Sequence, residues 1–297
     1  MVLRVGHFPN VTHVQALVAR AMARAGAPWF EPRLAQDLSI EWYLYNAGPS
    51  AMEAFFADTL DLTYVGPGPA INAYARARGE TIRIIAGAVE GGAGLVVRPD
   101  AGLRTQADFR GRRIATPQLG NTQDVAARSW LAAGGLRITM SGGDALVVPA
   151  SNPDQIALFK AGQVDAVWTV EPWVSRLETE AGGTVLVEET DAVTTVLAAR
   201  ARFIERHCDV AQRFVAAHAE LTAWVRANAD QAQAMVRGEL AALTRTEVRP
   251  ALIARAWRRI ILTPDASRPA LESFVMKAKE AGFLRSVPYL SRLLVVF

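Results

Sequence analysis

Apolar positions follow two alternating spacings along most of the chain. Short continuous apolar runs are typical of buried strands, and apolar residues that recur every three or four positions predict helices. In the first third of the chain these patterns predict strands and helices at Leu3–Gly6, Thr12–Ala25, Ser39–Tyr45, Ser50–Ala57, Leu60–Val65 and Ile82–Ala88. Strands that alternate with helices in this way predict an α/β fold.

Two distant segments share one residue pattern. SAMEAFFADTLDLTYVGPGP covers Ser50–Pro69, and DQIALFKAGQVDAVWTVEPW covers Asp154–Trp173. Each reads as a short helix, a polar corner, a buried strand and a proline turn. Aligned without gaps, the segments pair Phe55 with Phe159, Leu60 with Val164, Asp61 with Asp165 and Tyr64 with Trp168. This repeat predicts two similar α/β lobes that face one another.

The stretch IATPQLGNTQDV, from Ile114 to Val125, reads as a strand end, a polar loop and a helix start. It holds no lysine, no nucleophile and no metal-ligand cluster. Ligands of open α/β sheets bind at the carboxyl ends of strands, and a helix start favours an anion. Gly120 allows close backbone approach, and Asn121 is a good N-cap, with Asp124 placed for a weak capping box. Two interpretations stay open: the turn binds an oxyanion through N–H groups and hydroxyls, or Asn121 only caps its own helix.

Composition and charge exclude several classes of protein. The 297 residues are 51% hydrophobic and 21% charged, with a net charge of +3, which suits a globular protein of two lobes. No apolar run reaches the roughly 18 residues of a membrane span. The densest arginine group, Arg255–Arg259, indicates a solvated helix face rather than a nucleic-acid site. Cys208 is the single cysteine and cannot form an intrachain disulfide.

Four stretches in chain order carry a family resemblance: GHFPNVTHVQALVA, YNAGPSAMEAFFADTLDLTYVGPGPAINAY, GGAGLVVRPDAGLRTQADFRGRRIATPQLGNTQDVAARSWL and VDAVWTVEPW. Together they run from Val2 to about Ala199. They resemble the periplasmic substrate-binding proteins of the nitrate, sulfonate and taurine ABC importers. The resemblance is strongest for the aliphatic-sulfonate branch, where F-P-N-x-T-H, Y-V-G-P-G-P and T-P-x-L-G-N-T-Q-D are characteristic.

The resemblance implies a type II periplasmic-binding-protein fold, in which a two-stranded hinge joins two α/β lobes around a ligand cleft. Lobe one would comprise residues 1–88 and 194–297, with the C-terminal helices from Arg202 packed on it, and lobe two residues 89–193. The hinge strands would lie near Ala86–Gly92 and Glu188–Thr195.

The same resemblance implies a binding protein that works as a monomer, without cofactor, metal, catalytic residues or nucleic acid. Its partners would be a small anionic ligand and a cognate ABC permease and ATPase. The ligand would be an alkyl or aryl sulfonate or a taurine-like zwitterion. The location would be the periplasm, although the chain opens directly on the strand pattern MVLRVGHF, which also suits a cytoplasmic protein.

Matching the family motifs residue by residue gives the expected ligand set: Asn10, Thr12, His13, Asn46, Ala47, Gly48, Gly66, Gly68, Leu119, Gly120, Asn121, Thr122, Gln123, Glu171 and Trp173. Three of these have alternative roles. His13 donates to the anion or is structural, and Trp173 covers an apolar ligand tail or packs under its own turn. Glu171 receives a ligand ammonium or bonds to the N–H groups of its own helix start, since a bare carboxylate repels a sulfonate.

Two other functions compete with solute binding. Some relatives of this fold are enzymes, such as sulfinate desulfinases with a cleft cysteine and thiamine-pyrimidine synthases with a cysteine-rich segment. Cys208 lies outside every predicted cleft loop, which argues against both. The third class is the effector domain of a transcription regulator, which would need a DNA-binding segment.

Overall fold

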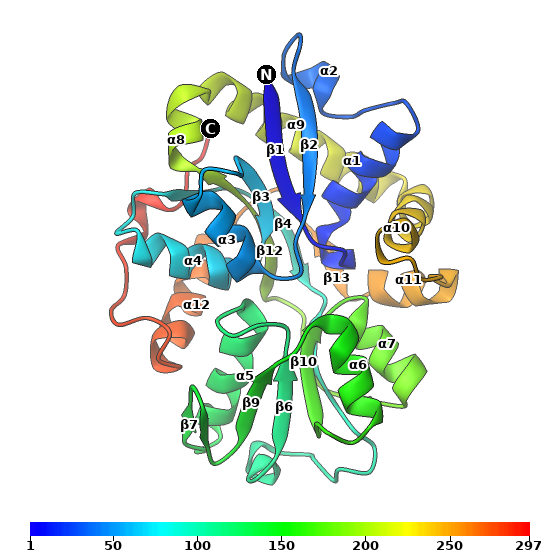
Figure 1. The fold of residues 1–297 in the computed structure, drawn as a ribbon, viewed down its shortest axis with the longest axis vertical. Helices are drawn as coiled ribbons and strands as arrows, with labels where there is room; N and C mark the ends of the chain where they lie inside the picture. The colour runs from blue at the N-terminus through cyan, green and yellow to red at the C-terminus, as the bar shows by residue number, and fades with distance from the viewer.

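The computed structural model describes residues 1–297, which form two main β-sheets (Figure 1). The six-stranded sheet has the order β13 (Ile260–Leu262), β4 (Ile82–Gly91), β12 (Val193–Arg200), β3 (Leu62–Val65), β1 (Val2–His7) and β2 (Ser39–Leu44). The five-stranded sheet has the order β11 (Thr184–Glu189), β5 (Ala93–Val97), β10 (Ala166–Val170), β6 (Arg113–Thr116) and β9 (Leu146–Pro149). A small ribbon pairs β7 (Ile138–Thr139) with β8 (Gly142–Gly143). We call the six-stranded sheet with its helices the upper half, and the five-stranded sheet with its helices the lower half.

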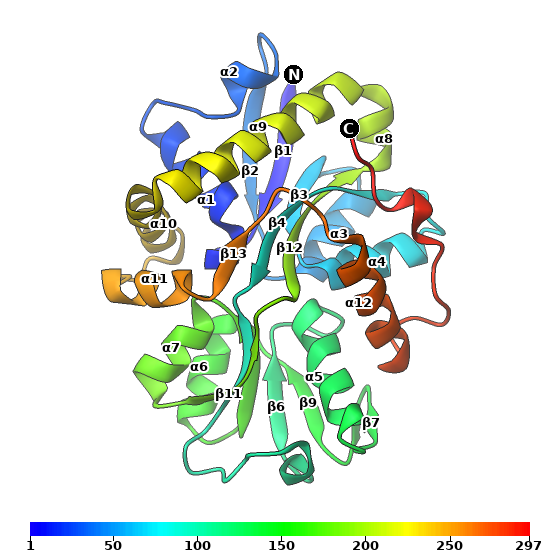
Figure 2. The ribbon, with the colours of Figure 1, turned by 180° about the vertical axis from the view of Figure 1, so that it is seen from behind.

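Helices cover both faces of each sheet (Figures 1 and 2). The upper half carries η1 (Val11–His13), α1 (Val14–Arg24), α2 (Glu31–Leu34), α3 (Gly48–Phe56), α4 (Pro67–Arg76), α8 (Ala201–Arg206), α9 (Cys208–Ala227), α10 (Ala229–Thr244), α11 (Pro250–Trp257), α12 (Arg268–Glu280) and η3 (Leu290–Arg292). The lower half carries η2 (Gln106–Phe109), α5 (Thr122–Ala133), α6 (Asn152–Lys160) and α7 (Trp173–Ala181). The strands and helices predicted from apolar spacing are confirmed to within a few residues. None of the helices combines the length and apolar character needed to cross a lipid bilayer.

The internal repeat is confirmed by equivalent hydrogen bonds in the two halves. Asp61 Oδ2 accepts the Arg4 N–H at 3.1 Å, where β1 runs parallel to β3. Asp165 Oδ2 accepts the Arg113 N–H at 2.9 Å, where β6 runs parallel to β10. Strand order also matches, because β12-β3-β1-β2 corresponds to β5-β10-β6-β9. Each aspartate therefore fixes the start of a central strand, and the same edge of both sheets faces the gap between the halves.

The chain crosses between the halves at two places. One is Gly91–Gly92 between β4 and β5, and the other lies between β11 and β12. Gly91 and Gly92 both have a φ of +70°, and a Cβ on Gly91 would lie 2.5 Å from the Arg259 carbonyl oxygen. These positions therefore require glycine. Both crossings fall within the predicted hinge strands, while the lobe boundaries and the hinge motion stay predictions.

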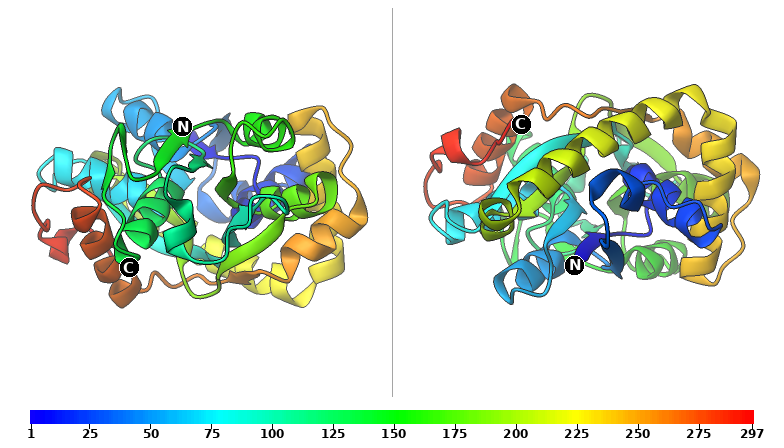
Figure 3. Two further views of the ribbon diagram at one scale, coloured as in Figure 1. Left: turned by 90° about the horizontal axis from the view of Figure 1, so that it is seen from below. Right: turned by 90° about the horizontal axis from the view of Figure 1, so that it is seen from above.

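Four apolar clusters hold the helices on the sheets. The largest, of 36 residues, joins the upper sheet to α1, α9, α10 and α11, and Figure 3 shows α9 lying along this sheet. A second cluster, of 21 residues, lies under α3, α4 and α12. It also contains Val125 of α5 beside Leu271 and Val275 of α12. The C-terminal helices thus pack on the upper half as expected, but α12 also contacts the lower half.

His218 ties α9 to the centre of the upper sheet. Its Nδ1 lies 3.0 Å from the Tyr64 hydroxyl, and its Nε2 lies 2.8 Å from the Gly87 carbonyl oxygen, so the neutral ring carries its proton on Nε2. Burial lowers the pKa of His218 to about 4.

This burial predicts a pH-dependent loss of stability. As the pH falls from about 6.5 to 4, the unfolded chain takes up a proton at His218 and the folded chain does not. The free energy of unfolding should therefore fall by about 1.4 kcal/mol per pH unit from this residue alone. Urea unfolding of the protein and of His218→Gln, measured at several pH values in this window, should give a shallower dependence for the variant by that amount. Equal pH dependence in the two proteins would contradict the assignment.

Candidate functional site

A small cavity lies between the two halves, at the carboxyl ends of their central strands. We call it the inner chamber. Its volume is about 30 Å³, which is room for about two water molecules. It is lined by Phe8, Asn10, Thr12, His13, Asn46, Ala47, Gly48, Gly66, Pro69, Pro117, Asn121, Thr122, Gln123, Asn152, Val170 and Thr194.

The lining of the inner chamber contains no aspartate, glutamate, lysine or arginine. Two α-helices start at its wall, α3 at Gly48 in the upper half and α5 at Thr122 in the lower half. The starts of η1 and α4 contribute less, because the Val11 N–H donates to the Glu171 carbonyl oxygen and α4 begins with Pro67. The first N–H groups of a helix lack intrahelical partners and carry the positive end of its dipole. The chamber therefore offers an anion partial positive charges from both halves without any formal positive charge.

Side-chain donors of the upper half add to these N–H groups. Asn10 Oδ1 accepts from Trp173 Nε1 at 2.9 Å and from Asn152 Nδ2 at 3.4 Å, which leaves the Asn10 Nδ2 without a protein partner. His13 Nδ1 accepts the Phe8 N–H at 3.4 Å, so the neutral ring carries its proton on Nε2. Burial, together with nearby His7, holds the pKa of His13 well below its usual value. His13 is therefore a neutral donor, as is the Thr12 hydroxyl, which bonds to no protein group.

In the lower half, the turn before α5 is organised by Asp124. Its carboxylate accepts from Thr116 Oγ1 at 3.1 Å, the Gly120 N–H at 2.8 Å and Arg128 Nε at 3.1 Å. Burial raises the pKa of Asp124 in spite of these donors. Asn121 Oδ1 in turn accepts the Asp124 N–H at 2.8 Å, so Asn121 caps α5.

These bonds change two expectations about the turn. The Asp124 carboxylate reaches the Gly120 N–H, one residue before the N-cap, instead of the N-cap N–H of a true capping box. The Gly120 N–H is thereby occupied and is not free for a ligand. The N–H groups of Thr122 and Gln123, at the first positions of α5, remain without intrahelical partners.

The two halves touch beside the inner chamber through Thr122. Its Oγ1 accepts the Gly68 N–H at 3.2 Å. A Cβ on Gly66 would lie 2.3 Å from this oxygen, and a Cβ on Gly68 would lie 3.1 Å from the Thr122 backbone. Both glycines are therefore required by close approach. Because Thr122 covers the Gly68 N–H, Gly68 lies behind the chamber wall and does not line it.

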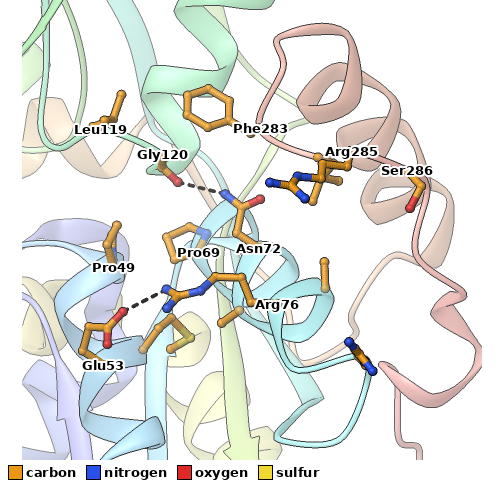
Figure 4. Close-up of a pocket in the computed structure, with 15 residues that line it drawn as sticks. Pro49, Glu53, Pro69, Asn72, Arg76, Leu119, Gly120, Phe283, Arg285 and Ser286 are labelled. Atoms are coloured by element: carbon orange, nitrogen blue, oxygen red, sulfur yellow. Dashed lines mark hydrogen bonds and ion pairs between the residues drawn. The ribbon is translucent and has the colours of Figure 1, made fainter. Parts of the chain in front are cut away.

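Leu119 and Gly120 do not line the inner chamber. They line a separate cavity of about 680 Å³ beside α3 and α4, which we call the side cavity (Figure 4). There the Gly120 carbonyl oxygen accepts from Asn72 Nδ2 at 3.3 Å. The positive φ of Gly120, +77°, turns this part of the chain away from the chamber.

Glu171 and Trp173 also lie outside the chamber lining. Glu171 is fully buried and accepts from the Ser175 N–H at 3.1 Å and from Arg259 Nη1 at 3.0 Å. Burial raises the pKa of Glu171, while Arg259 and Ser175 act against that rise. The structure thus supports the second role considered for Glu171, bonding at its own helix start. Trp173, in the lower half, packs under its turn and donates a hydrogen bond from Nε1 to Asn10 Oδ1 of the upper half.

Sequence reasoning missed Asn152 and Thr194, which line the chamber. Asn152 follows β9, which corresponds to β2 in the repeat, and Asn46 follows β2. Extending the repeat alignment to these strand ends would have indicated Asn152. The Arg259 contact with Glu171 was also missed, because nothing local in the sequence signals a bond between residues so far apart.

Comparisons with known proteins give a consistent picture. The sequence model of the NMT1-like family matches residues 2–238. A putative aliphatic sulfonates-binding protein of Bacillus subtilis (strain 168) is 26% identical over 211 residues, or 69% of this chain and 61% of that protein. The matched part thus spans about six tenths of the relative's length.

Among solved structures, the alkanesulfonate-binding protein of Xanthomonas axonopodis pv. citri bound to MOPS is 20% identical, with a TM-score of 0.78 over 100% of this chain and 98% of that chain. A cysteine-to-serine mutant of DszB in complex with biphenyl-2-sulfinic acid is 17% identical, with a TM-score of 0.67 over 99% and 96% of the two chains. These likenesses confirm the predicted fold class, the periplasmic-binding-protein fold.

The buried pair of Asp124 and Arg128 generates a stability prediction. Their side chains are 1% and 2% exposed. Asp124→Ala would leave the guanidinium buried without its partner and should lower the free energy of unfolding by about 3–5 kcal/mol in urea titrations. Asp209→Ala removes an exposed, unbonded carboxylate from the first turn of α9 and should cost less than about 1 kcal/mol. Equal losses in both variants would show that the pair does not hold the turn.

Proposed function

The chain belongs to the NMT1-like family, and from this premise we propose that it is the solute-binding component of an ABC importer. It captures the oxyanionic head of a small organic ligand in the inner chamber and releases it to a cognate permease and ATPase. The observation that carries the proposal is the composition of the chamber, where donors from both halves converge without a charged side chain. The proposed ligand residues are Asn10, Thr12, His13, Asn46, Ala47, Gly48, Gly66, Asn121, Thr122, Gln123 and Asn152.

The chamber size restricts the proposed ligand. The chamber has room for about two water molecules, so at most the sulfonate head, and not the organic part of the ligand, can lie inside it. Asn46 and Asn152 line both the chamber and a larger cavity of about 680 Å³ outside it. We therefore place the anionic head in the chamber and the alkyl or aryl tail in that outer cavity, beside Leu44 and Ile156. Sulfonate binding by the Bacillus and Xanthomonas relatives, as their names state it, supports this choice.

A taurine-like zwitterion is less well supported than a simple sulfonate. Its ammonium would need a carboxylate near the anion, and Glu171 was the residue considered for that role. The Glu171 carboxylate lies outside the chamber lining and is already bonded to Arg259 and Ser175. The chamber lining holds no carboxylate, and Glu180 of the outer cavity is bonded to Arg176.

The DszB likeness raises the alternative of an enzyme. A cysteine in the chamber would favour it, but Cys208 is exposed at the start of α9 and does not line the chamber. Incubating the pure protein with alkyl sulfonates and aryl sulfinates tests the alternative directly. Sustained product formation that Thr122→Val abolishes would decide for catalysis.

Thr122 provides the main test of the proposed site. Thr122→Val keeps the side-chain shape but removes the hydroxyl that accepts the Gly68 N–H and lines the chamber. Losing a hydrogen bond of about 1.5–3 kcal/mol should weaken the binding of 1-butanesulfonate roughly ten- to hundredfold in calorimetric titration. Thr184→Val, on exposed β11, is the matched control and should bind normally. Normal affinity in both variants would remove Thr122 from the site.

Gly66 tests whether the halves must close on the ligand. A valine at this position would push Thr122 away, because a Cβ there would lie 2.3 Å from the Thr122 hydroxyl. The backbone of Gly66, with φ −66° and ψ 150°, accommodates valine without strain. We expect 1-butanesulfonate to reduce the radius of gyration of the unmodified protein in small-angle scattering. The Gly66→Val variant should keep the larger radius and bind 1-butanesulfonate poorly. Full affinity with an unchanged radius would argue against closure.

A further inference from the structure

The side cavity is a second site of different chemistry from the inner chamber. Its walls come from α3, α4, the turn at Leu119–Gly120 and the segment Phe283–Ser286. Its volume of about 680 Å³ lies in the range of small-molecule sites. It is thus large enough to hold a whole organic ligand.

The side cavity carries formal positive charge, unlike the inner chamber. Arg76, Arg78 and Arg285 line it together with one carboxylate, Glu53, so three positive charges face one negative charge. Arg76 Nη1 bonds to Glu53 Oε1 at 2.9 Å, whereas Arg78 and Arg285 form no ion pair. Two guanidinium groups, which bind carboxylates and sulfonates well through paired N–H donors, are therefore free for an anion.

Asn72 lies at a wall of the side cavity whose polar groups are incompletely bonded. Its Nδ2 donates to the Gly120 carbonyl oxygen, which fixes the amide orientation, and its Oδ1 is buried without a hydrogen bond. A buried acceptor without a partner is costly unless a ligand or water supplies a donor. An anion has no donor of its own, so in the proposed complex a bridging water donates to both Asn72 Oδ1 and the anion. Figure 4 shows the Arg285 side chain directed toward Asn72 at this wall.

Apolar side chains complete the lining. Met52, Leu119 and Phe283 also line the cavity, and Leu119 is 47% exposed. An apolar ligand body placed against Leu119 and Phe283 would remove this surface from water.

We propose that the side cavity binds an amphipathic organic anion, with its carboxylate or sulfonate at Arg285 and its apolar body against Leu119 and Phe283, while Arg78 adds positive charge to the lining. Because Leu119 and Gly120 belong to the lower half and the other walls to the upper half, the complete site exists only when the halves meet. An anion bound there stabilises the closed arrangement and, by linkage, raises affinity at the inner chamber. The inference that a site exists does not rest on the proposed function; only the coupling to the chamber does.

The experiment uses 2-naphthoate, a planar aromatic carboxylate. Because its carboxylate can also enter the inner chamber, 1-butanesulfonate is present at saturation to fill that site. Its binding is measured by calorimetry in the whole protein, in Arg78→Gln/Arg285→Gln and in Arg104→Gln/Arg237→Gln. The last pair removes two exposed arginines without ion pairs, far from the cavity in the sequence and outside its lining. We expect the cavity variant to lose at least about tenfold in affinity and the control to lose less than about twofold. Leu119→Asp, which puts a negative charge in the wall at an exposed position, should abolish binding.

Further measurements distinguish a failure of this inference from a failure of the proposed function. Gly66→Val holds the halves apart and should weaken the binding of both 2-naphthoate and 1-butanesulfonate. The cavity variant Arg78→Gln/Arg285→Gln should still bind 1-butanesulfonate. No binding of 2-naphthoate at millimolar concentration would overturn the inference. Equal losses in the cavity and control variants would do the same, since they indicate general charge attraction. Loss of 1-butanesulfonate binding in every protein, with 2-naphthoate retained, would overturn only the proposed function.

Discussion

The contact of Thr122 with Gly66 and Gly68 is the constraint on which the site depends. The Gly68 N–H reaches Thr122 Oγ1 at 3.2 Å, and no side chain larger than hydrogen fits at Gly66 without moving Thr122. This approach, together with the bond from Asn72 of α4 to the Gly120 carbonyl oxygen, brings the start of α5 against the starts of α3 and α4. It also explains the small volume of the inner chamber, because two helix starts in direct contact leave little space between them. Because these glycines have no side chain, Thr122 can approach them closely. This close approach positions the donors around the inner chamber.

The inner chamber gathers donors without a formal charge, and its neighbours preserve this neutrality. His13 stays uncharged because burial and His7 disfavour its protonated form. The Asp124 carboxylate behind the turn is matched by Arg128, so the buried pair orders the turn and adds no net charge. A neutral site holds an anion by dipoles and hydrogen bonds, and it incurs no cost of an uncompensated buried cation when the anion leaves. This property suits the proposed role, in which the ligand is bound and released repeatedly. The side cavity, open to solvent, keeps its guanidinium groups hydrated and can therefore carry formal charge.

Sequence patterns correctly predicted the features that depend on interactions between residues close together in the chain. Apolar spacing located the strands and helices, and the pairing of Asp61 with Asp165 anticipated two corners with the same N–H to carboxylate bond. Motif matching placed Asn10, Thr122 and their neighbours at the chamber. The helix-start role considered for Glu171 agrees with its bond from Ser175, and what local patterns did not predict are long-range contacts and the direction of the backbone. Glu171 points to Arg259, far away in the sequence, and the left-handed conformation of Gly120 sends Leu119 to another cavity. Neither result is encoded in the spacing of nearby residues.

The internal repeat explains why the inner chamber forms. The segment of the upper half that has no counterpart in the lower half explains why the side cavity lies beside it. Matching strand order makes both sheets present their carboxyl ends to the same gap, so helix starts of the upper and lower halves meet there. The lower half has no counterpart of the segment that follows β13. In the upper half that segment continues as α12, which packs against both α4 and Val125 of α5, and then as Phe283 and Arg285. A perfectly repeated molecule would leave this flank of the gap open to solvent. The added segment instead covers this flank of the gap. Its Arg285 contributes to the positive charge that distinguishes the side cavity from the inner chamber.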